Sequence, residues 1–341
     1  MFWKILLIQF FLDFYKMEKI SGIISLTQHS SSKYGKKIYV FGEYHSSKHK
    51  CSPKKGSIRF DKFVTKTLKQ NPDKIIDIYT EEEFIKKSIH KKRKRAGWAR
   101  DVDFGSSLDY FTKTFENCLM VNKKCKEKNI RVHYTDVRAI VNILQLKFGH
   151  WDIAEMLTIL INIKENKQRF LKYKSKIEKS NFNDYLKFDK IFKLTKITKQ
   201  FSKITDQKLR NKLHTFFIKK LKKLVPKNPN KTIKSLYFSI REQLKSGIIP
   251  KDEVRKLRRI FRDLFTYNTI LMDAYLMGRV FKTFDDDVNP HAENVMILAG
   301  DKHCETYREL LKYLRFKTVR KTYSTKEENC VDISKFKQPF F

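Results

Sequence analysis

The amino-acid sequence predicts an α/β protein with a mostly parallel central sheet flanked by helices, an N-terminal β-hairpin and a large lysine-rich helical insertion. Short apolar runs alternate with helical patterns over residues 17–150 and again after residue 260, which is typical of parallel sheets covered on both faces. Over residues 151–260, apolar positions recur at intervals of three and four with lysines opposite, as in amphipathic helices. The expected segments are an apolar extension (1–16), the first half of the α/β core (17–150), the insertion (151–260), and a core helix with the C-terminal α/β half (261–341).

The elements of the first half are predicted in chain order. "SGIISLTQHSSSKYGKKIYVFGEYH" predicts two strands, because its polar centre supplies a turn between two apolar runs. A helix over about 58–70 ends at Asn71 and Pro72. "KIIDIYTEEEF" predicts a third strand that ends in acids, and residues 86–104 a long polar loop. "LDYFTKTFENCLMVNKKCKEKN" then predicts an amphipathic helix, and "IRVHYTDVR" a fourth strand.

The second half begins with the helices of the insertion, which break near Ser180, Pro226–Pro229 and Gly247–Pro250. "DEVRKLRRIFRDLFTYNTILMDAYLMGRVFKTF" predicts a long helix that becomes more apolar toward its end. The chain then returns to the α/β pattern, with a strand in "VMILAG", a helix in "CETYRELLKYL" and a strand in "FKTVRKTYS".

The charge of the chain has two interpretations. A formal net charge of +37 indicates attraction to nucleic acid or anionic lipid. Lysine is about three times as frequent as arginine, however, and Ile, Phe, Tyr and Asn are also plentiful. These residues share A/T-rich codons, and direct readers of nucleic acid favour arginine. Codon bias is therefore preferred over a nucleic-acid partner, and the same composition suits a large DNA virus of a protist or an A/T-rich eukaryote.

The cysteines and the apolar start bear on location. The five cysteines form no C-x-x-C pair, which argues against a disulfide framework or a zinc ribbon. Reduced cysteines fit a cytoplasmic location, which for a viral protein means the host cytoplasm or the virion. "MFWKILLIQFFLDFY" is interrupted by Asp13 and is too short to span a bilayer. A mis-assigned start or an added helix is preferred over a weak anchor or a secretion signal. No transmembrane span is expected, and the oligomeric state stays open.

Acids and histidines gather at the predicted strand ends, where ligands of parallel sheets collect. "IYVFGEYH" ends in Glu43 and His45, and "VMILAGDKH" ends in Asp301 and His303. The third strand ends in residues 81–83 and the fourth in Asp136 and Arg138. Because residues two apart in extended backbone point the same way, Glu43 and His45 are expected to converge, as are Asp301 and His303. Gly42 and Gly300 would permit close approach of a ligand.

This residue set predicts a divalent metal. Two imidazoles with one or two carboxylates suit Mn, Fe, Co or Zn, and such a metal lowers the pKa of a bound water. A carboxylate outside the metal's ligands would then be the general base.

Each part also has a plain structural interpretation. A single G-x-x-H is a weak motif, residues 81–83 suit the first turn of a helix, and "HKKRKR" at 90–95 suits a solvated loop better than a localisation signal or a phosphate-binding patch. Cys304 is expected to be an inert thiol.

The motifs "FGEYH", "DIYTEEE", "DAYLMGRVF" and "LAGDKH" resemble those of the superfamily that joins TraB/PrgY proteins, Tiki metalloproteases, ChaN and erythromycin esterase. The resemblance covers roughly residues 20–140 and 262–323, and it implies a metal-dependent hydrolase or, as in ChaN, a haem-iron-binding protein. It implies His45, His303 and Glu81 as metal ligands, and Glu43, Glu81 and Arg279 as catalytic residues. Glu83 is the alternative to Glu81 by register, and the secondary candidates are Asp136, Arg138, Asp301 and Asp273.

The sequence therefore predicts a metal-dependent hydrolase that acts on an ester or peptide bond in a small-molecule or peptide substrate. Two alternatives stay open. One is a non-enzymatic basic protein that binds nucleic acid or belongs to a virion, as suggested by the net charge. The other is a degenerate enzyme that keeps the fold without the chemistry.

Overall fold

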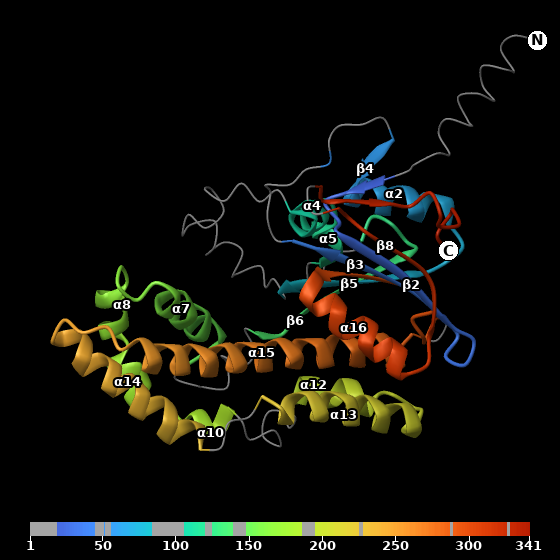
Figure 1. Cartoon of the computed structure of the whole chain (residues 1–341). Helices are drawn as coiled ribbons and strands as arrows, with labels where there is room; N and C mark the ends of the chain where they lie inside the picture. Colours follow the sequence, from blue (N-terminus) through green and yellow to red (C-terminus); the bar gives the residue numbers. More distant parts are fainter. Residues whose placement is uncertain are drawn as a thin grey trace, which may run out of the picture. The chain divides into compact units, whose positions relative to one another are not determined.

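A computed structural model describes residues 19–44, 51, 56–83, 106–119, 125–138, 148–185, 195–224, 228–286, 289–325 and 328–341. The chain divides into two compact units (Figure 1). One, the α/β unit, comprises residues up to Asp136 and from Thr283 to the C-terminus, and the other, the helical unit, comprises Val137–Lys282. The helical unit thus includes segments on both sides of the 151–260 insertion that the sequence predicts. The predicted α/β class, with its mostly parallel sheet and helical insertion, is confirmed.

The α/β unit is built on a six-stranded sheet with the strand order β6-β5-β7-β3-β2-β8. Its strands, in chain order, are β2 (Ser25–Ser31), β3 (Lys36–Glu43), β5 (Ile76–Glu83), β6 (Ile130–Asp136), β7 (Asn294–Gly300) and β8 (Lys317–Tyr323). Neighbouring strands from β6 to β3 are parallel, whereas β2 runs antiparallel to both β3 and β8. The hairpin of β2 and β3 is the one that the sequence predicts. The carboxyl ends of β6, β5, β7 and β3 therefore meet at one edge of the sheet.

One face of this sheet is covered by an aromatic core. Alternate residues of the strands, such as Tyr39 and Phe41 of β3, pack with Phe60 and Phe63 of α2 (Phe60–Gln70) and with Phe111. The helices α4 (Ser107–Thr114) and α5 (Glu116–Leu119) cover the same face. They replace the single helix that the sequence predicts there. A small sheet, which the sequence does not predict, joins this layer: β4 (Ser57–Arg59), β1 (Lys19–Ser21) and β9 (Cys330–Asp332).

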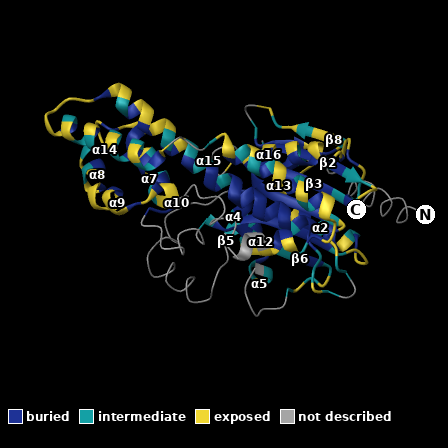
Figure 2. Ribbon diagram, turned by 90° about the horizontal axis from the view of Figure 1, so that it is seen from below, coloured by how far each residue is buried: buried dark blue, intermediate teal, exposed yellow. Residues whose placement is uncertain are grey.

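The other face of the sheet carries α16 (Asp301–Tyr313), which contacts β3, β7 and β2 (Figure 1). Apolar side chains of α16 at intervals of three and four, including Tyr307, Leu310 and Leu311, are fully buried. Figure 2 shows the same division, with buried residues along the strands and exposed ones on the outer sides of the helices. Because α16 starts directly after β7, its first turn lies at the edge where the parallel strands end.

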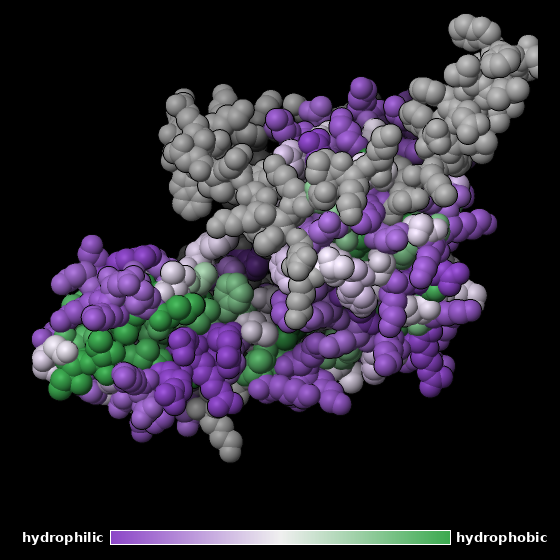
Figure 3. Space-filling model, turned by 45° about the horizontal axis from the view of Figure 1, so that its top comes forward, coloured by the Kyte–Doolittle hydropathy of each residue, from purple (hydrophilic) through white to green (hydrophobic). Residues whose placement is uncertain are grey.

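The helical unit packs short helices on one long helix, α15 (Lys251–Phe281). The other helices that the structure describes in this unit are α7 (His150–Ile161), α8 (Lys167–Lys172), α9 (Lys174–Lys179), α10 (Phe182–Tyr185), α12 (Thr195–Ser202), α13 (Gln207–Lys222) and α14 (Pro229–Lys245). Its core joins Phe148, Phe170, Tyr237 and Phe261 with smaller apolar residues. Polar residues cover most of the visible surface, and an apolar area shows at the left of Figure 3, over this unit. Trp151 and Ile161 of α7 are among the exposed apolar side chains.

The cysteines and the hydropathy of the helices give two further findings. Cys51 is bonded to Cys330 and Cys118 to Cys125, while Cys304 is a buried free thiol. The expectation of no disulfide framework is therefore wrong, because the fold brings together cysteines that lie 279 residues apart in the chain. Among the helices in the described ranges, none is both long and apolar enough to cross a membrane.

Candidate functional site

The parallel strands bring several of the expected residues to one edge of the sheet. Glu43 is the last residue of β3 and is paired in register with Gly300, the last residue of β7. On the other side of β7, β5 pairs with it as far as Thr80. Glu81, near the carboxyl end of β5, therefore lies at the same edge, where α16 begins after β7. A bulge between Thr80 and Glu83 interrupts the alternation of side chains there.

Glu81 and His303 form a buried pair at this edge. Oε1 of Glu81 lies 3.2 Å from Nε2 of His303, and the two side chains are 4% and 7% exposed. The other oxygen, Oε2, accepts a hydrogen bond from the backbone N–H of Gly300 at 2.9 Å. The carboxylate of Glu81 is thus oriented by the end of the neighbouring strand, with one oxygen directed at the imidazole.

Asp301 and His303 do not converge as their spacing suggests. The predicted geometry assumes extended backbone, but α16 begins at Asp301. Residues two apart on a helix face different sides, so Asp301 turns the other way. Its Oδ1 accepts hydrogen bonds from the hydroxyl of Ser25 and from Arg308, the latter at 3.0 Å.

Gly42 permits a close approach, although the approaching groups belong to the chain itself. A Cβ at this position would lie 2.3 Å from Oδ1 of Asp301 and 2.3 Å from Oγ of Ser25. The glycine before Glu43 is therefore explained by the packing of α16 and β2 against β3.

Glu43 is directed to the opposite face of the sheet from Gly42, as alternation along a strand requires. It is 1% exposed, and its Oε2 accepts a hydrogen bond from the backbone N–H of Leu108 at 3.0 Å. Leu108 is in the first turn of α4, where a carboxylate satisfies a free N–H and favours the helix dipole. This contact gives Glu43 a helix-anchoring role in addition to the predicted catalytic one.

The remaining predicted residues are spread over the chain. His45 and the basic run 90–95 lie outside the described residues. Glu83 pairs with Asp136 through the backbone, and the placement of its side chain is likewise not described. Asp136 is buried at the end of β6. Arg138, Asp273 and Arg279 belong to the helical unit, where Asp273 is fully buried and Nη1 of Arg279 donates to the Tyr275 hydroxyl at 3.4 Å.

Within the described residues, two places could hold a metal ion. Glu81 and His303 offer a carboxylate and an imidazole, and their 3.2 Å spacing fits two ligands of one ion, since tetrahedral ligands about 2.1 Å from a metal lie about 3.4 Å apart. Within the described part of the chain, no third carboxylate, imidazole or thiol lies near enough to Glu81 and His303 to complete a group of three metal ligands. The sequence predicts His45 as the further ligand of this site.

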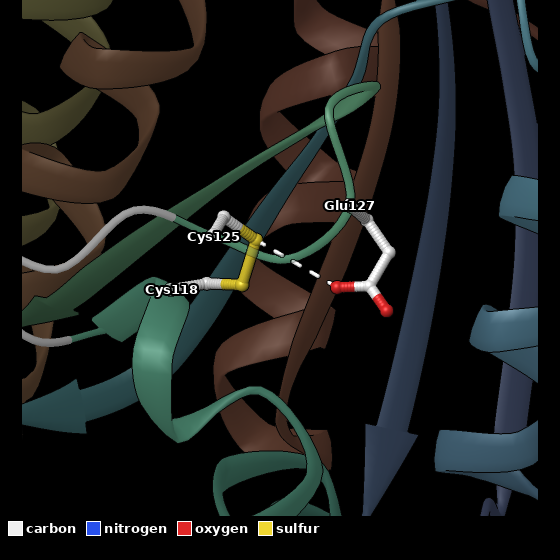
Figure 4. A group of neighbouring side chains, drawn as sticks. All are labelled: Cys118, Cys125 and Glu127. Carbon is white, nitrogen blue, oxygen red and sulfur yellow. Dashed lines mark hydrogen bonds between the residues drawn. A yellow bond between two sulfur atoms is a disulfide. The ribbon is translucent and has the colours of Figure 1, made fainter.

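The second place is a cluster of Cys118, Cys125 and Glu127, whose potential ligand atoms lie within 4.8 Å of one another (Figure 4). The two sulfurs are joined in a disulfide, and Oε2 of Glu127 lies 3.9 Å from Sγ of Cys125. The disulfide withholds both thiolates, and only the reduced form provides this set of ligands. The sequence does not predict the cluster.

A buried ionic network, also missed from the sequence, lies at the amino ends of the strands. Asp77 of β5 binds Arg131 of β6 through two hydrogen bonds of 2.8 Å and His133 through one of 2.7 Å. Burial tends to raise the pKa of Asp77, but the hydrogen bonds from His133 and Arg131 outweigh it and hold the pKa below its ordinary value. Arg131 also binds the Asp286 carboxylate and the Asn289 carbonyl, which ties these two residues to the sheet. The sequence signal for this network is limited to polar residues at alternate positions of two predicted strands, in "DIY" (77–79) and "RVH" (131–133).

Comparison with protein-family models, with curated proteins and with solved structures gives no match for this chain. The functional assignment therefore depends on the geometry of the sites.

Proposed function

We propose that the protein is a metal-dependent hydrolase of ester or peptide bonds, with Glu81 and His303 as metal ligands. The observation that carries the proposal is their buried pair at the edge where parallel strands end, which is the common ligand position in such sheets. A carboxylate and an imidazole suit Zn, Mn, Fe or Co. A bound metal of this kind supplies a water of lowered pKa.

The surrounding residues support this assignment through orientation. The backbone N–H of Gly300 fixes the plane of the Glu81 carboxylate, and contacts of this type outside the metal's own ligands are common at metal sites. His45 follows β3 by two residues and is the proposed further ligand. Glu43 ends the same strand, and because its side chain is bonded to α4, its proposed part is to hold that helix rather than to act as the base. The resemblance to the TraB, Tiki, ChaN and erythromycin esterase motifs favours the same residues.

Metal analysis by mass spectrometry tests the proposal. After dialysis against Zn, Mn or Co, the purified chain is expected to retain about one ion, and Glu81→Gln and His303→Gln are expected to lose it. Asp301→Asn is the matched control, because it lies in the same turn of α16 but is bonded to Ser25 and Arg308. Cys118→Ser removes the other candidate cluster and is expected to leave the retained ion in place.

Activity on a model ester and on a peptide then separates an active enzyme from a degenerate one. Hydrolysis that depends on the added metal and is lost in His303→Gln supports the hydrolase. Retention of the metal in both variants would show that Glu81 and His303 are only a structural ion pair.

The second candidate function, nucleic-acid binding, is favoured by α13. This helix carries five lysines, one arginine and no acid among its 16 residues, and its apolar residues Leu209, Leu213 and Phe217 are buried on the other side. A cationic helix without acids of its own attracts phosphate backbones. A steep decrease in affinity with salt, reduced by a Lys208→Gln/Lys212→Gln variant, is expected if the helix binds nucleic acid, and a flat salt response contradicts it.

A further inference from the structure

A groove of about 780 Å³ lies on the α16 side of the sheet, bordered by α16, β2 and the edge strand β8. The three elements are neighbours in Figure 1, and all belong to the α/β unit. The volume is in the range of sites for small molecules.

The floor of the groove is polar, whereas the neighbouring strands β3 and β7 carry apolar residues on this face, including Val40 and Ile297. Thr27 and His29 of β2 line the groove, and both are 2% exposed. Thr27 is paired with Lys321 of β8 and His29 with Thr318, and the register of the two strands shifts between Gln28 and His29. A strand that only needed to pack under α16 would carry apolar residues here, as β3 and β7 do.

His29 is held neutral within this floor. Its Nε2 lies 3.0 Å from the Thr27 hydroxyl and its Nδ1 lies 3.3 Å from the Thr318 hydroxyl. Burial and, as the smaller cause, the nearby charge of Arg308 lower its pKa to about 4. The floor therefore offers uncharged hydrogen-bonding groups.

The positive charge lies at the walls. Arg308 is fixed by its bonds to Asp301 and Ser25, and its side chain is 14% exposed. Lys312 of α16 and Lys321 of β8 line the groove from opposite sides. Both are exposed, and within the described residues neither takes part in an ion pair. Glu309 is the single acid among the lining residues.

We propose that this groove binds a small oligophosphate, either free or as the phosphate tail of a nucleotide. Convergent lysine and arginine charges above hydroxyl donors suit phosphate oxygens. The groove is concave and of limited volume, which favours a small ligand over a nucleic-acid duplex, whose backbone needs an extended cationic face. Tyr323, an exposed aromatic ring at the groove, offers a surface on which a nucleotide base can stack. This site is separate from the Glu81–His303 pair and does not depend on its function.

Isothermal titration calorimetry at physiological ionic strength, with tripolyphosphate and with ATP, tests the proposal. One site per chain is expected. Lys312→Gln and Lys321→Gln are each expected to weaken binding about threefold, as for exposed ion pairs, and the double variant about tenfold. The matched control is Lys62→Gln, an exposed lysine on α2 at the other face of the sheet. If ATP binds more tightly than tripolyphosphate and Tyr323→Ala removes this difference, the ligand is a nucleotide. If the two ligands bind equally, the ligand is a free oligophosphate.

The proposal fails if neither ligand binds. It also fails if Lys62→Gln weakens binding as much as Lys321→Gln does, because the net charge alone would then explain the affinity. In that case the cations of β8 serve only to protect an edge strand from pairing with other chains.

Discussion

The buried imidazole of His29 makes the stability of the α/β unit sensitive to mild acid. Its pKa is lowered from the ordinary 6.5 to about 4 by burial and by Arg308. The unfolded chain therefore binds a proton between these values that the folded chain does not, so the free energy of unfolding decreases as the pH falls from 6.5 toward 4.

The magnitude follows from the two pKa values. A tenfold change in proton affinity corresponds to about 1.4 kcal/mol, so the full effect is on the order of 3 kcal/mol below pH 4, and about 2 kcal/mol is lost between pH 7 and pH 5. The charged group that acts on the imidazole is Arg308 of α16, whose positive charge disfavours a proton on His29.

Urea unfolding at pH 7, 6 and 5 measures this effect in the native chain and in His29→Gln. The variant is expected to be less stable at pH 7, because it loses the buried imidazole. Between pH 7 and pH 5, however, its free energy of unfolding should fall by about 2 kcal/mol less than that of the native chain. His291→Gln is the control, because its side chain is exposed. Equal pH dependence in His29→Gln and the native chain would refute the reasoning.

Three further predictions concern the fold. Gly42→Ala is expected to cost about 1–3 kcal/mol in urea unfolding, because the new Cβ overlaps Ser25 and Asp301. Asp77→Ala is expected to lower the free energy of unfolding by about 3–5 kcal/mol, because it leaves a buried arginine and histidine without their carboxylate. Asp286, a partner of the same arginine, is 38% exposed, so Asp286→Ala should lower it by less than about 1 kcal/mol. Similar losses in the two variants would contradict the role of burial. Thiol titration of the unfolded, unreduced chain should find one thiol, Cys304, and a count of five would exclude both disulfides.

Most of the strands and helices could be predicted because their signals are local. The apolar run that ends at Glu43, the acids after "DIYT" and the helix after "VMILAG" are all found at the predicted places. The short strands β1, β4 and β9 carry no comparable signal, since three residues are too few to show a period. Their pairing depends on contacts between segments that are far apart in the chain.

The candidate site shows the same division. The sequence determined that Glu43, Glu81 and His303 lie at or just beyond the carboxyl ends of strands, and hence at the same edge of a parallel sheet. Only the tertiary structure decided which of them meet. A bulge in β5 and the start of α16 at Asp301 direct Glu81 and His303 toward each other, while Glu43 turns to α4 and Asp301 to Arg308. Strand position is encoded in local hydrophobic pattern, but the direction of a side chain at a strand end depends on the backbone turn and on partners that come from elsewhere in the chain.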